Sequence, residues 1–394
     1  MRLEFHTAGE SHGRGILVFV SGLPAGMAVD LGFIERELAR RRKGFGVSPR
    51  MSLEEDRVEV LAGLRWGKTL GSPLAFFVEN AEYEKWKPLM DPVGERPENY
   101  EEITVPRPGH ADLGGLVKYR FRDIRNVIER ASARETVGRC IAGALAKLFL
   151  ASFGVRVGGF VESIGGIRVS AEGKSWEEVF ERALSSPLAT LGREEEMEAR
   201  IAQALEQGDT LGGTFIVAAS GVVPGLGSYV EVHTRLDSRL AFYLMGIPGV
   251  KGVEIGEGFR GAELPGSAVH DAIFYDAGRS PFPFYRKTNR SGGIEGGVST
   301  GEVIWVRCAM KPIPTLRQGL HSVDVVSKRE VTARYERSDV CAVPRALVVG
   351  EAMLAWVLAG AYLEKFGGDT LEETIERFRE YCLYLESFKA RERC

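Results

Sequence analysis

Two of the six histidines stand in short glycine-rich or proline-rich segments, which favours their presentation to a ligand over packing in a core. His12 belongs to TAGESHG, residues 7–13, and His110 belongs to PRPGHADLGG, residues 106–115. Gly109 directly precedes His110, and a turn at this glycine would present the imidazole. Because an imidazole gains or loses a proton near neutral pH, both side chains are candidates for acid–base chemistry or for stabilising a charge.

The residues GESHG, 9–13, also fit the G-x-S-x-G pattern of a nucleophile elbow, which would make Ser11 the nucleophile of a hydrolase. An elbow needs a helix directly after its serine. Here the sequence RGILVFVSGLPAG, residues 14–26, predicts another short strand that ends in a turn. A serine hydrolase is therefore the less favoured interpretation of this segment.

Basic residues are concentrated in two segments of a chain whose net charge is −3. Residues 36–50 hold six Lys or Arg and one acid, and residues 104–139 hold eight Lys or Arg and four acids. Guanidinium groups pair with carboxylates and phosphates through two parallel hydrogen bonds, so the pattern favours a small anionic ligand. A solvated helix face is the alternative. Nucleic acid is disfavoured because the overall charge is negative and few aromatic residues are interleaved.

Two further segments combine residue types that do chemistry. RASARET, residues 130–136, would place Ser132, Arg134 and a carboxylate on one helical turn. RSDVCAVP, residues 337–344, sets Arg337 beside Asp339 just before an expected helix.

The elements that must position these residues form an α+β pattern, because strands and helices come in blocks rather than in strict alternation. We expect antiparallel sheets and, since no linker is visible, a single domain over residues 1–394. Helices are expected over 30–42, from about 126 to before Gly154, and from Pro344 to Gly367. Capping boxes at Ser175 and Thr370 open two more. Strands are expected over 2–5 and 15–20, and β-rich stretches over 156–169, 213–232, 251–259 and 292–308.

Composition limits the class of protein. The longest uninterrupted apolar stretch, residues 352–363, is 12 residues, shorter than the roughly 20 that span a bilayer, so no membrane segment is expected. The N-terminus does not have the pattern of a secretory signal. Five scattered cysteines without a C-x-x-C pair suit a reducing cytoplasm and predict no metal site.

Long ordered motifs along nearly the whole chain resemble the chorismate synthase family. They are TAGESHG (7–13), RPGHAD (107–112), YRFRDIRNVIERASARET (119–136), GDTLGG (208–213), GLGSY (225–229), KGVEIGEGF (251–259), GGIEGGVSTG (292–301), MKPIPTL (310–316) and ERSDVCAVP (336–344). The resemblance implies a β-α-β sandwich, with helices between antiparallel sheets, assembled as a homotetramer. It also implies a lyase of the shikimate pathway. Such an enzyme converts 5-enolpyruvylshikimate 3-phosphate into chorismate and phosphate by an anti-1,4 elimination that needs reduced FMN without net redox change.

The resemblance assigns roles to the motif residues. His12 becomes the acid for the leaving phosphate, His110 stabilises the negative charge of reduced FMN, and Asp339 assists removal of the ring proton to the flavin. The substrate's carboxylates and phosphate would be held by Ser11, Arg41, Arg50, Arg107, Arg134 and Arg337. The flavin would be held by Ser132, Ala133, Arg134, Gly296, Gly297, Lys311, Pro312, Ile313, Pro314, Thr315 and Arg337.

One position departs from the family's pattern. After RRRKGFG, residues 40–46, the family commonly has another arginine, whereas this chain has Val47, so one basic contact at the mouth of the site is in doubt. A flavin-dependent oxidoreductase and a non-catalytic anion- or RNA-binding protein stay open as alternatives. Whether the protein reduces its own flavin with NADPH or depends on an external reductant also stays open.

Overall fold

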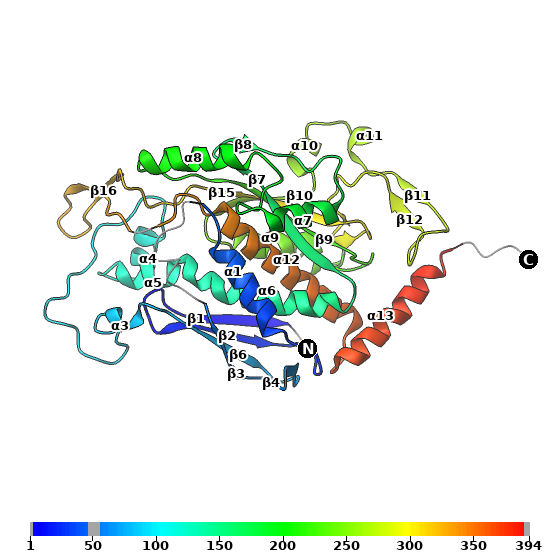
Figure 1. Ribbon diagram of the computed structural model, residues 1–394, viewed down its shortest axis with the longest axis horizontal. Helices are drawn as coiled ribbons and strands as arrows, with labels where there is room; N and C mark the ends of the chain where they lie inside the picture. Colours follow the sequence, from blue (N-terminus) through cyan, green and yellow to red (C-terminus); the bar gives the residue numbers. More distant parts are fainter. Residues whose placement is uncertain (1–2, 46–55, 337, 390–394) are drawn as a thin grey trace, which may run out of the picture.

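Two antiparallel sheets enclose a layer of helices (Figure 1). The computed structural model of the protein describes residues 3–45, 56–336 and 338–389. One sheet has the order β1-β2-β6-β3, formed by β1 (Glu4–Gly9), β2 (Gly15–Ser21), β6 (Leu74–Glu79) and β3 (Val58–Ala62). The other has the order β10-β15-β9-β7-β8, formed by β10 (Val250–Ile255), β15 (Ile304–Met310), β9 (Gly213–Ser220), β7 (Arg156–Ile164) and β8 (Ile167–Arg168).

Two long helices fill the space between the sheets. α6 (Thr136–Ala151) packs on β1 and β2, and α12 (Val343–Phe366) packs on β7 and β9 and on α6 itself. α1 (Leu31–Arg42) and α9 (Leu236–Met245) lie against α12 as well. The predicted α+β sandwich with helices between antiparallel sheets is confirmed.

α12 is the central core helix. By length and composition alone it is apolar enough to cross a membrane, but 94% of its most apolar window is buried inside this fold. Its Glu351 is completely buried and forms ion pairs with Arg40 at 2.7 Å and Lys147 at 2.7 Å, while Lys147 also pairs with Glu37 at 2.5 Å. This four-residue network joins α1, α6 and α12, and it fixes the end of α1 that carries Arg41.

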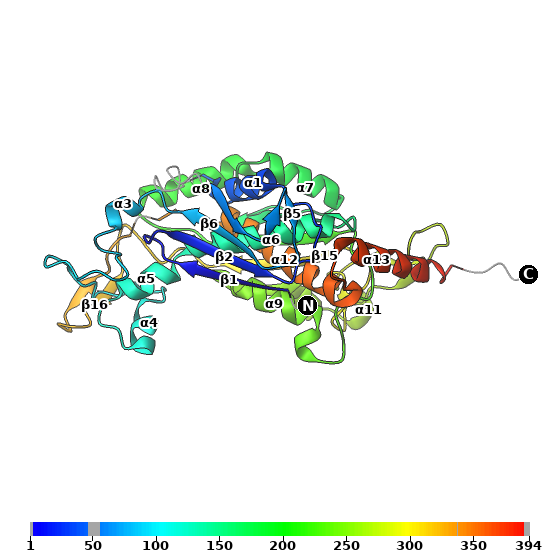
Figure 2. The same ribbon diagram turned by 90° about the horizontal axis from the view of Figure 1, so that it is seen from below.

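The remaining helices and the small hairpins lie around this core of two sheets and central helices (Figure 2). The small hairpins are β4 (Leu64–Arg65) with β5 (Lys68–Thr69), β11 (Ile273–Tyr275) with β12 (Phe284–Arg286), β13 (Ile294–Glu295) with β14 (Val298–Ser299), and β16 (His321–Val323) with β17 (Glu330–Thr332). The other helices are α3 (Tyr83–Trp86), α4 (Asp112–Tyr119), α5 (Arg125–Ala131), α7 (Trp176–Ser185), α8 (Glu194–Glu206), α10 (Gly258–Gly261), α11 (Gly266–Val269), α13 (Leu371–Glu386) and the 3₁₀ turns η1 (Ala133–Glu135) and η2 (Val232–Thr234). Both predicted capping boxes are present, at the starts of α7 and α13.

The prediction of one continuous helix from about residue 126 is wrong, and the difference matters for the site. Ser132 has an extended backbone, with φ −70° and ψ 143°, which separates α5 from η1 and α6. Its side chain accepts a hydrogen bond from the amide of Arg134, as a serine does at a helix start. Ser132 and Arg134 therefore lie at a helix break rather than along one helical turn. The first strand also differs from its prediction, because β1 runs on through Thr7 to Gly9.

Candidate active site

A cavity of about 690 Å³ lies where β1, α5, η1, the start of α12 and the segment after β15 meet. The structure brings most of the predicted site residues to its wall although up to 328 positions separate them in sequence, from Ser11 to Asp339. They are Ser11, His12, Arg41, Arg107, His110, Ser132, Ala133, Arg134, Lys311, Pro312, Ile313, Pro314, Thr315 and Asp339. The volume is that of an ordinary small-molecule site.

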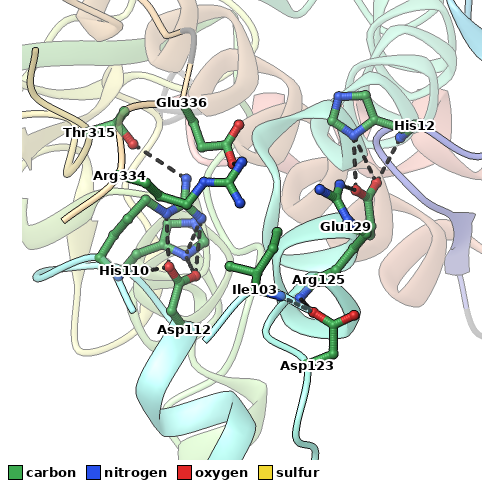
Figure 3. Close-up of polar contacts among 11 residues, drawn as sticks. His12, Ile103, His110, Asp112, Asp123, Arg125, Glu129, Thr315, Arg334 and Glu336 are labelled. Carbon is green, nitrogen blue, oxygen red and sulfur yellow. Dashed lines mark hydrogen bonds and ion pairs between the residues drawn. The ribbon is translucent and has the colours of Figure 1, made fainter. Parts of the chain in front are cut away.

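His12 is held by the carboxylate of Glu129, which lies on α5 (Figure 3). The backbone amide of His12 donates to Oε2 of Glu129 at 2.8 Å, and Nδ1 lies 2.9 Å from Oε1. Because an ionised carboxylate only accepts, Nδ1 carries a hydrogen and Nε2 is the ring nitrogen that Glu129 does not contact. Burial raises the pKa of Glu129, but the hydrogen bonds and charge of His12 and then the charge of Arg125 outweigh it and lower the pKa.

Trp86 and Arg125 complete the surroundings of His12. The rings of His12 and Trp86 lie 4.1 Å apart at an angle of 36°, and the guanidinium of Arg125 stands 5.1 Å from the same indole. Arg125 also donates to Oε1 of Glu129 at 3.2 Å. The imidazole is therefore fixed by a carboxylate at Nδ1 and by an aromatic ring against its face.

His110, like His12, has a carboxylate partner, which is Asp112 in the first turn of α4 (Figure 3). Nδ1 of His110 lies 2.5 Å from Oδ1 of Asp112, which again assigns the Nδ1 hydrogen to a carboxylate. Arg107 donates to the same carboxylate from its backbone amide, Nε and Nη2 at 2.8 to 3.0 Å. Burial raises the pKa of Asp112, but the hydrogen bonds from His110 and Arg107 outweigh it and hold the pKa well below its usual range.

The loop that carries His110 is anchored on both sides. Gly109 has φ +78°, a left-handed conformation that glycine adopts without strain, as the predicted turn requires. The ammonium of Lys311 donates to the carbonyl oxygen of Gly109, and Arg107 donates to Oγ1 of Thr315 at 3.4 Å. These contacts join the PGHAD loop to the segment 311–315.

A buried carboxylate, Asp56, holds two of the predicted arginines. Arg134 pairs with Oδ1 of Asp56 and also donates to Asn80 at 2.8 Å, while Arg41 donates to Oδ2 at 3.2 Å. Burial raises the pKa of Asp56, but the charges of Arg41 and then Arg134 outweigh it and lower the pKa. Both guanidinium groups thus have a fixed place in the cavity wall, and Nε of Arg41 is buried without a hydrogen-bond partner.

Ser11 does not sit in a nucleophile elbow. The chain enters β2, a strand, two residues after Gly13, and the Ser11 oxygen accepts a hydrogen bond from Ser132 at 3.1 Å. The ring of His12 is engaged by Glu129 at Nδ1. A hydrolase elbow would need a helix after Ser11, so the geometry excludes that architecture.

Asp339 also lines the cavity, just before α12, and forms an ion pair with Arg345 from the first turn of that helix. Glu336, which also lines the cavity, pairs with Arg334 at 2.6 Å. Among the described lining residues, five Lys or Arg side chains accompany two carboxylates, so the wall is positively charged. A cavity of this charge suits a ligand with several anionic groups.

Gly296 and Gly297 are not brought to the cavity within one chain. They form the turn between β13 and β14, where Gly297 accepts a hydrogen bond from the amide of Leu236 at the start of α9. The cavity is lined by Ile247, just past the other end of this ten-residue helix, so the helix length of about 15 Å separates the two places. Their contact with a flavin stays a prediction. Arg50, Arg337 and Val47 lie outside the described residues.

Sequence reasoning missed five residues that hold the site together: Asp56, Trp86, Asp112, Glu129 and Arg345. Asp112 stands two positions after His110, and a carboxylate so close to a histidine is the one signal that could have found it. Arg345 is six positions from Asp339, but no motif marked it. Asp56, Trp86 and Glu129 contact their partners through the tertiary fold, as with Glu129, which is 117 positions from His12.

The lining also fits the flavin that the resemblance implies. Pro312, Ile313 and Pro314 offer an apolar surface for a flat ring system, and the arginine side chains of the same lining offer donors to a phosphate. The orphaned Nε of the buried Arg41 is a donor that a bound anion would satisfy.

Comparisons with known proteins agree on one family. The family model described as chorismate synthase matches residues 3–363. The chorismate synthase of Moorella thermoacetica is 52% identical, over 98% of this chain and 99% of the relative, and that of Pelobacter propionicus is 49% identical, over 96% and 98%. A solved structure entitled "Crystal Structure of Chorismate Synthase" superposes with a TM-score of 0.79 at 40% identity and covers 98% of this chain and 99% of that one. With its sheets, helices and cavity arranged as described, the chain belongs to the chorismate synthase family, whose members are carbon–oxygen lyases.

Proposed function

We propose that this protein eliminates phosphate from 5-enolpyruvylshikimate 3-phosphate to give chorismate, with reduced FMN bound beside the substrate. The observation that carries the proposal is the pair of histidine–carboxylate contacts, His12 with Glu129 and His110 with Asp112, on the wall of one basic cavity. Such a cavity supplies what the elimination needs, which is charge for three anionic groups and a proton for the leaving phosphate.

His12 is the candidate acid for the leaving group. Glu129 holds Nδ1, and Nε2 is the nitrogen that would donate a proton to a phosphate oxygen as the carbon–oxygen bond breaks. The Glu129 carboxylate stabilises the positively charged form of the ring, and the indole of Trp86 keeps the ring in place. Ser11 and Ser132, whose hydroxyl groups are hydrogen-bonded to each other, also line this cavity and are our candidates to contact a phosphate oxygen.

His110 belongs to the flavin side of the cavity. Its neighbours are Lys311 and the apolar segment after it, which are the residues that would hold the isoalloxazine ring. When bound, reduced FMN supplies electron density to the substrate ring during elimination. The imidazole of His110, held by Asp112, would stabilise negative charge on its ligand, and Asp339, which lines the same cavity, is our candidate to assist removal of the ring proton.

The remaining properties follow the same proposal. We infer that the protein is a homotetramer. We also infer that it works in the cytoplasm, because a reducing compartment suits the free thiols of Cys140, Cys308 and Cys341. NADPH is a candidate source of the flavin's electrons, with an external reductant as the alternative.

The test is an anaerobic assay with purified protein, chemically reduced FMN and 5-enolpyruvylshikimate 3-phosphate. Chorismate and phosphate should appear together, and omission of reduced FMN should abolish both. Absence of product at saturating substrate, with the protein folded and FMN bound, would overturn the proposal.

A further inference from the structure

The first turn of α12 carries an arginine that the sequence motifs did not single out. Arg345 lines the cavity, and its side chain is 12% exposed. One arm of its guanidinium, Nη1, pairs with Oδ2 of Asp339. The other arm, Nη2, is fully buried and has no hydrogen-bond partner.

A buried donor without a partner costs stability, and more so when it carries charge. Burial, and next the nearby charge of Arg41, lower the pKa of Arg345 below its ordinary value. The Asp339 ion pair offsets part of that cost but engages only one arm of the fork. A guanidinium has donors on both arms, so the second arm of Arg345 is left for another acceptor.

The position of Arg345 in its helix points in the same direction. The start of a helix carries a partial positive charge, so a cation there is unfavourable. The first turn of α12 contains no acidic residue, and the carboxylate that compensates, Asp339, stands just before the helix and engages only one arm of the guanidinium. Helix stability therefore does not explain an arginine at this place. An anion that enters the cavity would remove the conflict, since it pairs with the guanidinium and with the helix start together.

Arg41 has the same kind of deficit. Its side chain is 5% exposed, its Nε is buried without a partner, and it shares Asp56 with Arg134. Arg41 and Arg345 approach one cavity from α1 and α12, two helices that pack against each other. Two buried cations that repel each other across a cavity form a ready site for a carboxylate or phosphate group.

We propose that Arg345 is a substrate-binding residue that, together with Arg41, binds a carboxylate or phosphate of the substrate. Its Nη1 at the same time keeps Asp339 in position. The inference rests on the proposed function and adds a residue to it. A single arginine thereby couples occupation of the anion site to the placement of the carboxylate that assists proton removal.

The experiment compares Arg345→Gln and Arg345→Lys with the wild-type protein. Dissociation constants are measured by calorimetry for 5-enolpyruvylshikimate 3-phosphate and for FMN, and turnover is followed in parallel. Arg345→Gln should weaken substrate binding by at least about tenfold, the loss of one charge-assisted pair, with FMN affinity changed by less than about twofold. Arg345→Lys, which keeps the charge but not the fork, should recover part of the affinity.

Arg239→Gln is the matched control, because Arg239 pairs with Glu364 at the far end of α12, at 2.6 Å, and does not line the cavity. It should leave substrate affinity unchanged. Competition by inorganic phosphate and by shikimate, which has a carboxylate but no phosphate, identifies the group that is held. The probe whose affinity falls in Arg345→Gln carries that group, and either result supports the proposal.

Unchanged substrate affinity in Arg345→Gln, with the wild type active, would overturn the inference and leave the proposed function intact. An equal loss in Arg239→Gln would also overturn it, because the effect would then belong to the helix rather than to the cavity. A wild-type protein that neither binds nor converts the substrate would overturn both proposals. Thermal unfolding of each variant identifies any loss that comes from misfolding.

Discussion

Glu129 binds His12 twice, at the backbone amide and at the ring Nδ1. This double contact fixes the position of the main chain and the orientation of the imidazole with one carboxylate, and it joins the end of β1 to α5. His110 has only the ring contact with its acid: its Nδ1 lies 2.5 Å from Oδ1 of Asp112 at the start of α4. Each histidine of the cavity is therefore oriented by a buried acid behind it.

Replacing Glu129 by glutamine should slow turnover by at least about tenfold, because the amide keeps the shape but removes the charge that stabilises the protonated ring of His12. FMN affinity should change little, since Glu129 does not line the cavity. Steady-state kinetics and calorimetry measure the two effects. Glu196→Gln, which breaks an exposed ion pair with Arg193, serves as the control, and equal activity of the two variants would contradict the role of Glu129.

The buried ion-pair network of Glu37, Arg40, Lys147 and Glu351 should make the stability of the fold fall at acidic pH. Burial raises the pKa of Glu37, but the charges of Lys147 and then Arg40 outweigh it and lower the pKa from 4.5 to about 2. A carboxyl group whose pKa is lower in the folded state stabilises the fold above its unfolded pKa, and this contribution is lost as pH falls through the folded value. The unfolding temperature of the wild type should therefore drop toward that of Glu37→Gln between pH 4.5 and 2. A constant difference across this range would contradict the assignment.

Removing the cation of the same network should be severe. Lys147→Met leaves the buried carboxylates Glu37 and Glu351 with Arg40 alone, and the loss of one partner of a buried pair costs about 3–5 kcal/mol. Urea unfolding measures this loss. Lys174→Met, at an exposed position, should change the free energy of unfolding by less than about 0.5 kcal/mol, and a similar small effect at Lys147 would show that the network does not stabilise the fold.

The contact between α6 and α12 depends on Gly143. A Cβ atom at this position would lie 2.2 Å from Cβ of Ala352, so Gly143→Ala should force the helices apart and cost about 1–3 kcal/mol. Gly360→Ala, on α12, meets nothing within 4 Å and should instead stabilise the helix by about 0.5–1 kcal/mol. Opposite signs in thermal unfolding are expected, and stabilisation by both substitutions would contradict the packing.

The sequence contains the local part of this structure. The capping boxes at Ser175 and Thr370, the turn at Gly109 and the apolar helix that stops at Gly367 all follow from neighbouring residues, and the structure has each of them. The prediction of one long helix through Ser132 was wrong because the helical spacing of apolar residues continues across the break between α5 and α6. There the serine side chain competes with the backbone for hydrogen bonds.

The site could be predicted as a set of residues but not as a set of contacts. The motifs predicted that His12, His110 and Asp339 belong to one site, and all three line the cavity. The contact of Glu129 with His12, and the place of Asp56 between two arginines, depend on how elements far apart in the sequence pack together. Arg345 is close to Asp339 in the sequence, but its residue type alone does not identify it as a partner. The sequence shows which residues are charged but not which of them form ion pairs, because the same residue type occurs both at the surface and in the core.

Elimination without net oxidation is tested most directly by the ratio of product to flavin oxidised under anaerobic conditions, with FMN far below the substrate concentration. We expect chorismate and phosphate to form in equal amounts, many molecules of each for each flavin, while the spectrum of FMN stays that of the reduced form. Oxidation of one FMN for each product would contradict it and would identify a flavin-dependent oxidoreductase instead.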